Sequence, residues 1–257
     1  MSEPLTLDGI ELTRIGLGTN RLTDRPENRE LLKTAVDAGL NFIDTANGYT
    51  NGESERTIGG ALAPFRENVV VATKGGYRDG RPDAISTQIE ESLQRLQTDT
   101  IPLYYLHRVD PDVPLEASLG AIREHRDQGT IRHVGISNVG VEEIERARQV
   151  VPVSAVQNHY SRTERGHDDV VDYCTQQKII FVPYFPLRGH DGATLTRIAR
   201  EHEATPAQIA LAWLLRRSPI MLPIPGTTSI EHLRENLGAL DVELTDAEYE
   251  ELDERRA

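Results

Sequence analysis

The sequence lacks the features that mark several large classes of protein. Its single cysteine, Cys174, excludes an intramolecular disulfide framework and a cysteine-rich metal site. No apolar run approaches the length of a membrane-spanning helix. The N-terminus has no basic segment followed by an apolar one, so we see no signal peptide. We therefore expect a cytoplasmic protein with no membrane partner.

Positive charge is also scarce. The 257 residues include 41 acidic and 28 basic side chains, which gives a formal net charge of -13. That balance disfavours nonspecific binding to nucleic acid or to anionic membranes. Hydrophobic residues make up 38% of the chain and charged residues 27%, which is the composition of a folded globular protein rather than a disordered one.

Strand-like and helix-like segments alternate along the whole chain. The pair Asp8-Gly9 separates two short alternating segments and predicts a β-hairpin. Eight strands are then predicted over 11–18, 40–45, 68–74, 101–107, 131–138, 153–160, 179–187 and 220–227. Helical patterns lie between these strands, and a further helix is predicted over 245–256.

Apolar strands joined by helical crossovers indicate a parallel sheet that is buried on both faces. Eight such units in a chain of this length predict an α/β fold, a (β/α)8 TIM barrel, with an N-terminal β-hairpin and a short C-terminal helix. We expect a single barrel domain over residues 1–257. A doubly wound open sheet is the weaker alternative because no G-x-G-x-x-G turn follows the first strand.

Reactive side chains stand at the ends of neighbouring predicted strands. Asp44, Lys74 and His107 end the second, third and fourth strands, and Tyr49 lies in the loop after the second. Alone, each has an ordinary explanation as a turn former, a solvated cation, a rim histidine or a loop aromatic. In a barrel, however, the carboxyl ends of all strands meet at one mouth. The combination therefore favours a catalytic site.

These four residue types suit the protonation of a carbonyl oxygen. A phenol has a pKa of about 10, and we expect the Lys74 ammonium to lower the pKa of Tyr49 by favouring the phenolate. Asp44 would hold Lys74 through an ion pair, and His107 would hydrogen-bond a substrate oxygen or assist proton transfer. None of these groups supplies electrons, so a hydride donor must also bind.

Seven stretches carry a resemblance to a known family: "NFIDTANGY", "VVVATKGG", "LYYLHR", "IRHVGISN", "AVQNHYS", "VPYFPL" and "PIPGTTSIEHLRENL". The sequence resembles the aldo-keto reductases over nearly its whole length, and "PYFPL" with "IPGTTSIEHLRENL" is similar to their bacterial pyridoxal-reductase-like branch. The resemblance implies an NAD(P)H-dependent barrel enzyme that reduces the carbonyl group of a small aldehyde or ketone to an alcohol. It makes Asp44, Tyr49, Lys74 and His107 the catalytic tetrad, with Tyr49 as the proton donor.

The resemblance also implies a cofactor site. Ser137, Asn138 and Gln157 would hold the nicotinamide carboxamide, and Tyr184 would stack on the nicotinamide ring. The remaining implied cofactor residues are Phe185, Leu187, Gly226, Thr227, Thr228, Ser229, His232, Glu235 and Asn236. Independently, Ser229 is a good N-cap, and a helix N-terminus favours phosphate. We expect NADPH as the cofactor. Gly226 and His232 stand where many family members have a lysine and an arginine, so NADH is the alternative.

Two other functions are open at this point. The chain would be a nucleotide-sensing regulatory protein if it kept the cofactor site but turned over slowly. It would be a metal-dependent or phosphate-handling barrel enzyme if ligands surrounded the mouth. His159 and His167 lack the spacing of a metal pair with a third ligand, so we expect no metal. Family members are often monomers, and we expect a monomer here.

Overall fold

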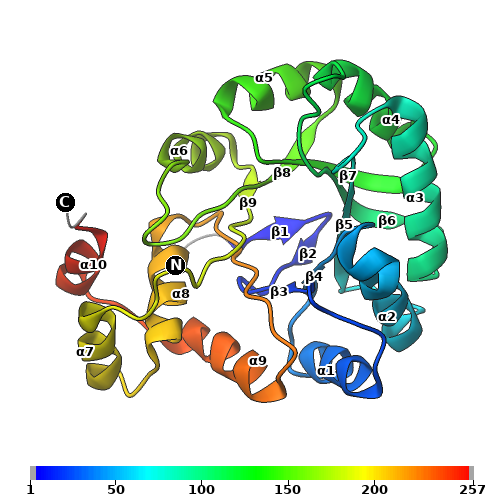
Figure 1. Cartoon of the computed structure of the whole chain (residues 1–257). Helices are drawn as coiled ribbons and strands as arrows, with labels where there is room; N and C mark the ends of the chain where they lie inside the picture. Colours follow the sequence, from blue (N-terminus) through cyan, green and yellow to red (C-terminus); the bar gives the residue numbers. More distant parts are fainter. Residues whose placement is uncertain (1–3, 255–257) are drawn as a thin grey trace.

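The computed structural model describes residues 4–254 and has an α/β fold in which a parallel sheet curls into a barrel inside a ring of helices (Figure 1). Within these residues the strands of the sheet follow one another in chain order, and each is parallel to its neighbour. They are β3 (Leu17–Gly18), β4 (Phe42–Asp44), β5 (Val70–Gly75), β6 (Ile101–Leu106), β7 (Ile131–Ser137), β8 (Val153–Gln157) and β9 (Ile180–Phe181).

An extended segment, 220–226, takes the place of the predicted eighth strand and closes the barrel. On one side the Leu222 N–H donates to the Phe181 carbonyl of β9 at 2.9 Å, and on the other the Gly16 N–H donates to the Pro223 carbonyl at 2.9 Å. The two prolines in this segment have no N–H, so a continuous ladder cannot form and isolated bridges join the segment to its neighbours. Closure places residue 226 beside the end of β3.

Two predicted strands are reduced to two residues each in the structure. The run 179–187 forms only β9, because Pro183 interrupts it and irregular backbone follows. The run 11–18 contributes only β3 to the barrel, and its first residue pairs within the hairpin instead.

The helices cover the outside of the barrel. Their buried positions recur at helical spacing, as in α3, where Ile85, Ile89, Ser92 and Leu96 face the sheet. None of the helices within residues 4–254 is long and apolar enough to cross a membrane. They are α1 (Pro26–Asp37), α2 (Glu53–Leu62), α3 (Pro82–Leu96), α4 (Leu115–Asp127), α5 (Val141–Val150), α6 (Asp168–Gln177), α7 (Ala193–Glu201), α8 (Pro206–Arg217), α9 (Ile230–Leu237) and α10 (Asp246–Asp253), with the 3-10 helices η1 (Tyr49–Gly52) and η2 (Gly238–Asp241).

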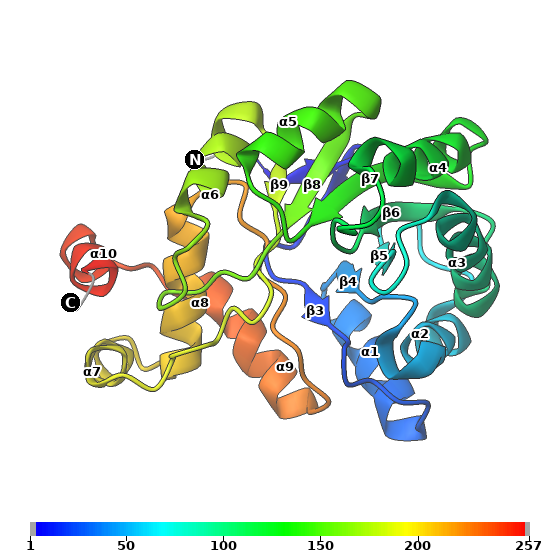
Figure 2. The same ribbon diagram turned by 45° about the horizontal axis from the view of Figure 1, so that its top comes forward.

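The predicted C-terminal helix is present as α10, which lies outside the ring against α7 and α8 (Figure 2). Thr245 caps it and forms a capping box with Glu248. The end of the predicted range, residues 255–256, lies outside the described part of the chain.

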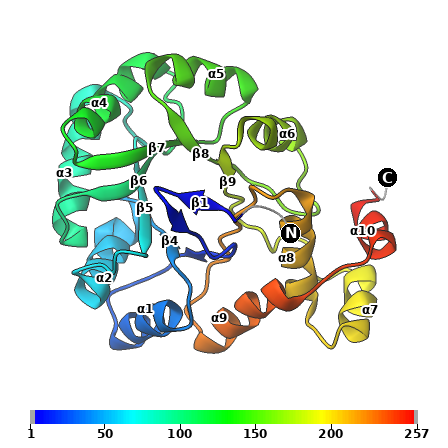
Figure 3. The same ribbon diagram turned by 180° about the vertical axis from the view of Figure 1, so that it is seen from behind.

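The predicted N-terminal hairpin is also present, as β1 (Thr6–Leu7) and β2 (Ile10–Glu11). Asp8 and Gly9 have φ values of 55° and 76°, as a two-residue hairpin turn requires. The hairpin lies across one end of the barrel (Figure 3), where Asp8 pairs with Arg132 near the start of β7 at 3.2 Å. Leu7 of the hairpin is buried and Ile10 is partly buried, so the hairpin covers the end at which the strands begin.

Candidate active site

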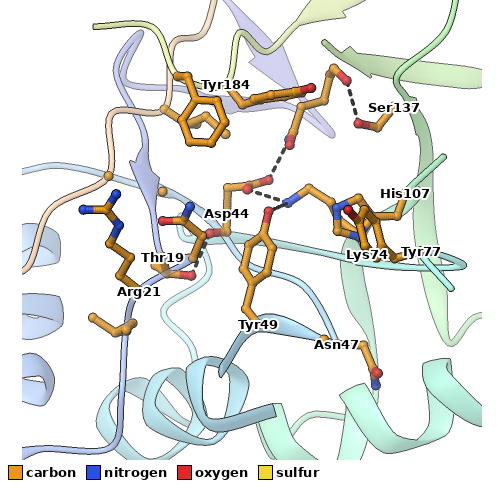
Figure 4. A pocket seen from close by; sticks show the side chains of 18 of the residues that line it. Thr19, Arg21, Asp44, Asn47, Tyr49, Lys74, Tyr77, His107, Ser137 and Tyr184 are labelled. Atoms are coloured by element: carbon orange, nitrogen blue, oxygen red, sulfur yellow. Dashed lines mark hydrogen bonds and ion pairs between the residues drawn. The ribbon is translucent and has the colours of Figure 1, made fainter. Parts of the chain in front are cut away.

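A cavity of about 1390 Å³ opens at the end of the barrel where the strands finish, and we call it the mouth cavity. Figure 4 shows part of its lining. Fourteen of the residues predicted from the sequence line it: Asp44, Tyr49, Lys74, His107, Ser137, Asn138, Gln157, Tyr184, Phe185, Leu187, Gly226, Thr227, Thr228 and His232. Three others do not: Ser229, Glu235 and Asn236.

Asp44 and Lys74 form a buried ion pair at the floor of the mouth cavity. They come from the adjacent strands β4 and β5, and the Lys74 Nζ lies 2.5 Å from the Asp44 Oδ1. Lys74 also donates to the Thr45 carbonyl at 2.7 Å, and the Gln157 Nε2 donates to the Asp44 Oδ2 at 2.8 Å. These bonds satisfy two charges that are almost fully removed from water.

Tyr49 begins η1 and turns its phenol toward this pair (Figure 4). Its hydroxyl lies 3.5 Å from the Lys74 Nζ, and its ring is edge-on to that of His107, with centroids 5.9 Å apart. Burial raises the pKa of the Tyr49 phenol, and the opposing effect of Lys74 is smaller. The expectation that Lys74 leaves the pKa of Tyr49 below its ordinary value is therefore wrong, because desolvation dominates. The phenol is protonated at neutral pH.

Lys74 and His107 also have defined charge states. Burial disfavours the Lys74 ammonium, but Asp44 and Tyr49 together hold the pKa of Lys74 above its ordinary value. Burial, with Lys74 and Arg108, lowers the pKa of His107 to about 3. Lys74 is therefore a cation and His107 a neutral imidazole at physiological pH. A neutral His107 can form a hydrogen bond with a substrate oxygen but is not the proton-donating acid.

Polar side chains from β7 and β8 and from the segment after β9 form a second network beside this floor. The Ser137 Oγ donates to the Gln157 carbonyl at 2.6 Å, and the Tyr184 hydroxyl donates to the Asn138 Oδ1 at 2.7 Å. The Asn138 Nδ2 in turn donates to the His107 carbonyl at 3.0 Å. These bonds fix the Ser137 hydroxyl, the Asn138 amide and the Tyr184 ring along one wall of the mouth cavity.

The loop that carries Tyr49 is held by a residue that the sequence analysis did not predict. Arg95 reaches from α3 and donates to the Asn47 carbonyl at 3.1 Å. Its guanidinium lies 2.9 Å from the Glu91 carboxylate and 3.4 Å from that of the buried Glu55. This contact was not predictable from the sequence, because it joins a side chain of α3 to the loop after β4.

The turn into α9 forms the far end of the mouth cavity. Ser229 caps the helix, as predicted, and its hydroxyl accepts from the His232 N–H at 3.4 Å. The Ser229 N–H donates to the Thr227 Oγ1 at 2.9 Å. The Ser229 hydroxyl therefore serves its own helix, whereas the exposed side chains of Thr228 and His232 line the cavity.

The sequence and the structure of the chain were compared with those of known proteins. A sequence profile of the Aldo/keto reductase family matches residues 14–194 and 190–257. The chain belongs to the aldo-keto reductase family. It is 33% identical to the pyridoxine 4-dehydrogenase of Escherichia coli over 98% of both chains.

Two solved aldo-keto reductases have similar structures. A thermostable aldo-keto reductase, crystallised with the inhibitor epalrestat, superposes with a TM-score of 0.90 at 36% identity over 98% of both chains. An aldo-keto reductase from Klebsiella pneumoniae, crystallised with NADPH, gives a TM-score of 0.88 at 30% identity over 98% of this chain and 95% of that one.

In this aldo-keto reductase, residues that were not predicted from the sequence also line the mouth cavity, and they include Tyr77, Arg21, Arg78, Arg108 and Arg188. A signal was available, because Tyr77 follows Lys74 by three residues and Arg108 directly follows His107. Among residues 4–254, no group of three or more His, Cys, Asp or Glu side chains is placed to hold a metal ion.

Proposed function

We propose that this aldo-keto reductase reduces aldehyde or ketone carbonyls to alcohols with NADPH, and that Tyr49 donates the proton. One observation carries the proposal: the Tyr49 hydroxyl lies 3.5 Å from the buried Lys74 ammonium in the mouth cavity. A phenol in this setting is a weak acid whose conjugate base is stabilised at once by a positive charge.

Each side chain then has a role in the reduction. NADPH, when bound, supplies a hydride to the carbonyl carbon. Tyr49 donates its hydroxyl proton to the carbonyl oxygen as negative charge develops there, and Lys74 stabilises the phenolate that remains. Asp44 fixes Lys74, and the neutral His107 donates a hydrogen bond to the same oxygen. The phenolate recovers a proton from solvent, and the substrate leaves as an alcohol.

The lining of the mouth cavity fits a dinucleotide. Asp44 is its one acidic member among residues 4–254, and that carboxylate is paired with Lys74. The nicotinamide would bind at Tyr184, Ser137, Asn138 and Gln157. The phosphates would lie at the start of α9, where N–H groups favour anions, and the adenine would lie near Glu235 and Asn236.

The preference for NADPH over NADH is part of the proposal. The Klebsiella pneumoniae relative was crystallised with NADPH. In this chain, however, His232 is the only basic residue of the turn 226–232. A histidine side chain offers a 2'-phosphate fewer N–H donors than arginine does, so NADH is the alternative cofactor.

The test begins with fluorescence titration of the purified protein with NADPH and, separately, NADH. Oxidation of bound NADPH is then followed against pyridoxal, aromatic aldehydes, diketones and simple ketones. We expect saturable NADPH binding and turnover of at least one of these carbonyls. Binding without turnover of any of them would favour the nucleotide-sensing alternative, and failure to bind either nucleotide would contradict the cofactor assignment.

A further inference from the structure

The mouth cavity is lined mainly by basic side chains among its charged residues, although the molecule as a whole is acidic. The chain has 41 acidic and 28 basic residues, yet five arginines and Lys74 line the cavity against one acid, Asp44. Asp44 is paired with Lys74, and Arg95 is paired with Glu91. Within residues 4–254, no carboxylate lies within 4.0 Å of the remaining four guanidinium groups, those of Arg21, Arg78, Arg108 and Arg188. A cavity with unpaired cations attracts anionic ligands.

The four arginines divide into two pairs on opposite sides of the barrel. Arg21 follows β3 and Arg188 follows β9, and these two strands flank the closing segment that leads to α9. Arg78 follows β5 and Arg108 follows β6, which lie across the barrel from that segment. Phosphates at the start of α9 would be near the first pair. The second pair, which we call the anion subsite, is left for another ligand.

Aromatic rings connect the anion subsite to the reacting centre. The Arg108 guanidinium carbon lies 5.2 Å from the centroid of the Tyr77 ring, within cation–π range. The Tyr77 ring centroid lies 4.9 Å from that of His107, and Figure 4 shows the two side chains next to each other. Tyr77 is 55% exposed, so its ring is available to a ligand in the cavity.

The neighbouring carboxylates are engaged elsewhere. Asp79 pairs with Arg81 at 2.6 Å. Asp110 accepts the N–H groups of Gly80 at 2.8 Å and Asp112 at 3.0 Å. These bonds hold both carboxylates in their own loops. The N–H groups of Asp112 and Gly80 lower the pKa of Asp110 and Arg108 adds a smaller effect, but within residues 4–254 no carboxylate forms an ion pair with either guanidinium group of the anion subsite.

We infer that Arg108, together with Arg78, selects carbonyl substrates that carry a carboxylate at the end remote from the reacting carbonyl. The inference rests on the proposed function, because it assumes that the carbonyl lies between Tyr49 and His107. A planar carboxylate matches a guanidinium, and the exposed ring of Tyr77 supports an aromatic or otherwise flat body between the two ends.

A matched pair of substrates tests the inference. 4-Carboxybenzaldehyde and 4-formylbenzamide have nearly the same shape but differ by one negative charge. We expect the wild-type enzyme to have a higher kcat/KM for the carboxylate. In Arg108→Gln, kcat/KM for the carboxylate should fall by about tenfold or more, mainly through KM, while that for the amide changes by less than about twofold. Arg78→Gln should produce a smaller loss of the same kind.

Arg123→Gln is the control, because Arg123 lies on α4 outside the mouth cavity, and it should leave both values unchanged. If kcat/KM fell equally for both substrates in Arg108→Gln, the anion subsite would be overturned, whereas the proposed reductase function would still stand. Weaker NADPH binding in that variant, with unchanged preference between the two substrates, would assign Arg108 to the cofactor and also overturn it. If the wild-type enzyme reduced neither of these substrates and none of the carbonyls in the wider panel, the proposed function itself would be contradicted.

Discussion

At the scale of single residues, the state of Tyr49 depends on a balance between burial and one ammonium. Burial raises the pKa of the phenol, and Lys74 opposes it. Lys74→Met should therefore raise that pKa further and slow reduction, because the phenolate loses its stabilising charge. Since reduction needs the protonated phenol, the alkaline fall in kcat/KM should move to higher pH. An alkaline fall at the wild-type pH would count against this role of Lys74.

That variant needs a control for stability. Lys74→Met leaves the buried Asp44 without its partner, which typically costs about 3–5 kcal/mol. The double variant Asp44→Asn/Lys74→Met removes both charges and should recover part of this loss without recovering the rate. The comparison separates the role of Lys74 in folding from its role in the reaction.

The placement of Asp44, Lys74 and His107 was predictable because each stands at the end of an apolar strand, and strand ends meet in a barrel. The direction of the shift in the Tyr49 pKa was not predictable, because it depends on how deeply the fold buries the phenol. Nor was the link between Arg95 and the Tyr49 loop, which joins α3 to a segment 48 residues earlier.

At the scale of elements, the turn after Tyr49 depends on Gly52. Thr50, Asn51 and Gly52 all have positive φ, with values of 47°, 54° and 80°. In Gly52→Ala a left-handed alanine costs about 1–2 kcal/mol, and its Cβ would lie 2.7 Å from the Arg95 guanidinium carbon. We expect lower stability in urea and a reduced kcat, because a small displacement of Tyr49 misaligns the proton donor.

Gly120→Ala in α4 is the matched control. An added Cβ at Gly120 has nothing within 4 Å, and alanine favours a helix by about 0.4–1 kcal/mol through its less flexible unfolded state. This variant should be as stable as the wild type or more so, with unchanged kcat. A Gly52→Ala enzyme that matched it in both properties would contradict the account of the turn.

Which elements form was largely predictable, whereas the extent of several strands was not. Helical spacing of apolar residues and the alternation of helix and strand are local patterns, and they gave the order of the barrel. The runs 179–187 and 220–227 are apolar enough for strands, but prolines within them remove the ladder N–H groups. At the last strand position, isolated bridges therefore join the segment 220–226 to its neighbours in place of a regular strand.

At the scale of the whole molecule, the burial of His107 links folding to pH. Its pKa is about 3 in the folded protein and about 6.5 in the unfolded chain, so between these values the unfolded chain binds the extra proton. His107 should therefore lower the stability as the pH falls below 6.5, by up to about 1.4 kcal/mol per unit, until the folded pKa near 3.

His107→Gln removes this titration. From pH 7 to pH 4.5 the wild type should lose about 2–3 kcal/mol more in its free energy of unfolding than the variant does, as measured by urea unfolding at each pH. Parallel curves for the two proteins would show that His107 is not held neutral by burial.

The central claim is that Tyr49 donates the proton, and single-turnover oxidation of bound NADPH by an aldehyde from the panel tests it in Tyr49→Phe. The control is Tyr173→Phe, which removes a hydroxyl that accepts from Arg148 outside the mouth cavity. We predict that Tyr49→Phe binds NADPH as the wild type does but reduces the aldehyde about 100-fold to 10,000-fold more slowly, while the control keeps the wild-type rate. A Tyr49→Phe enzyme that reduces the aldehyde at the wild-type rate would contradict the account.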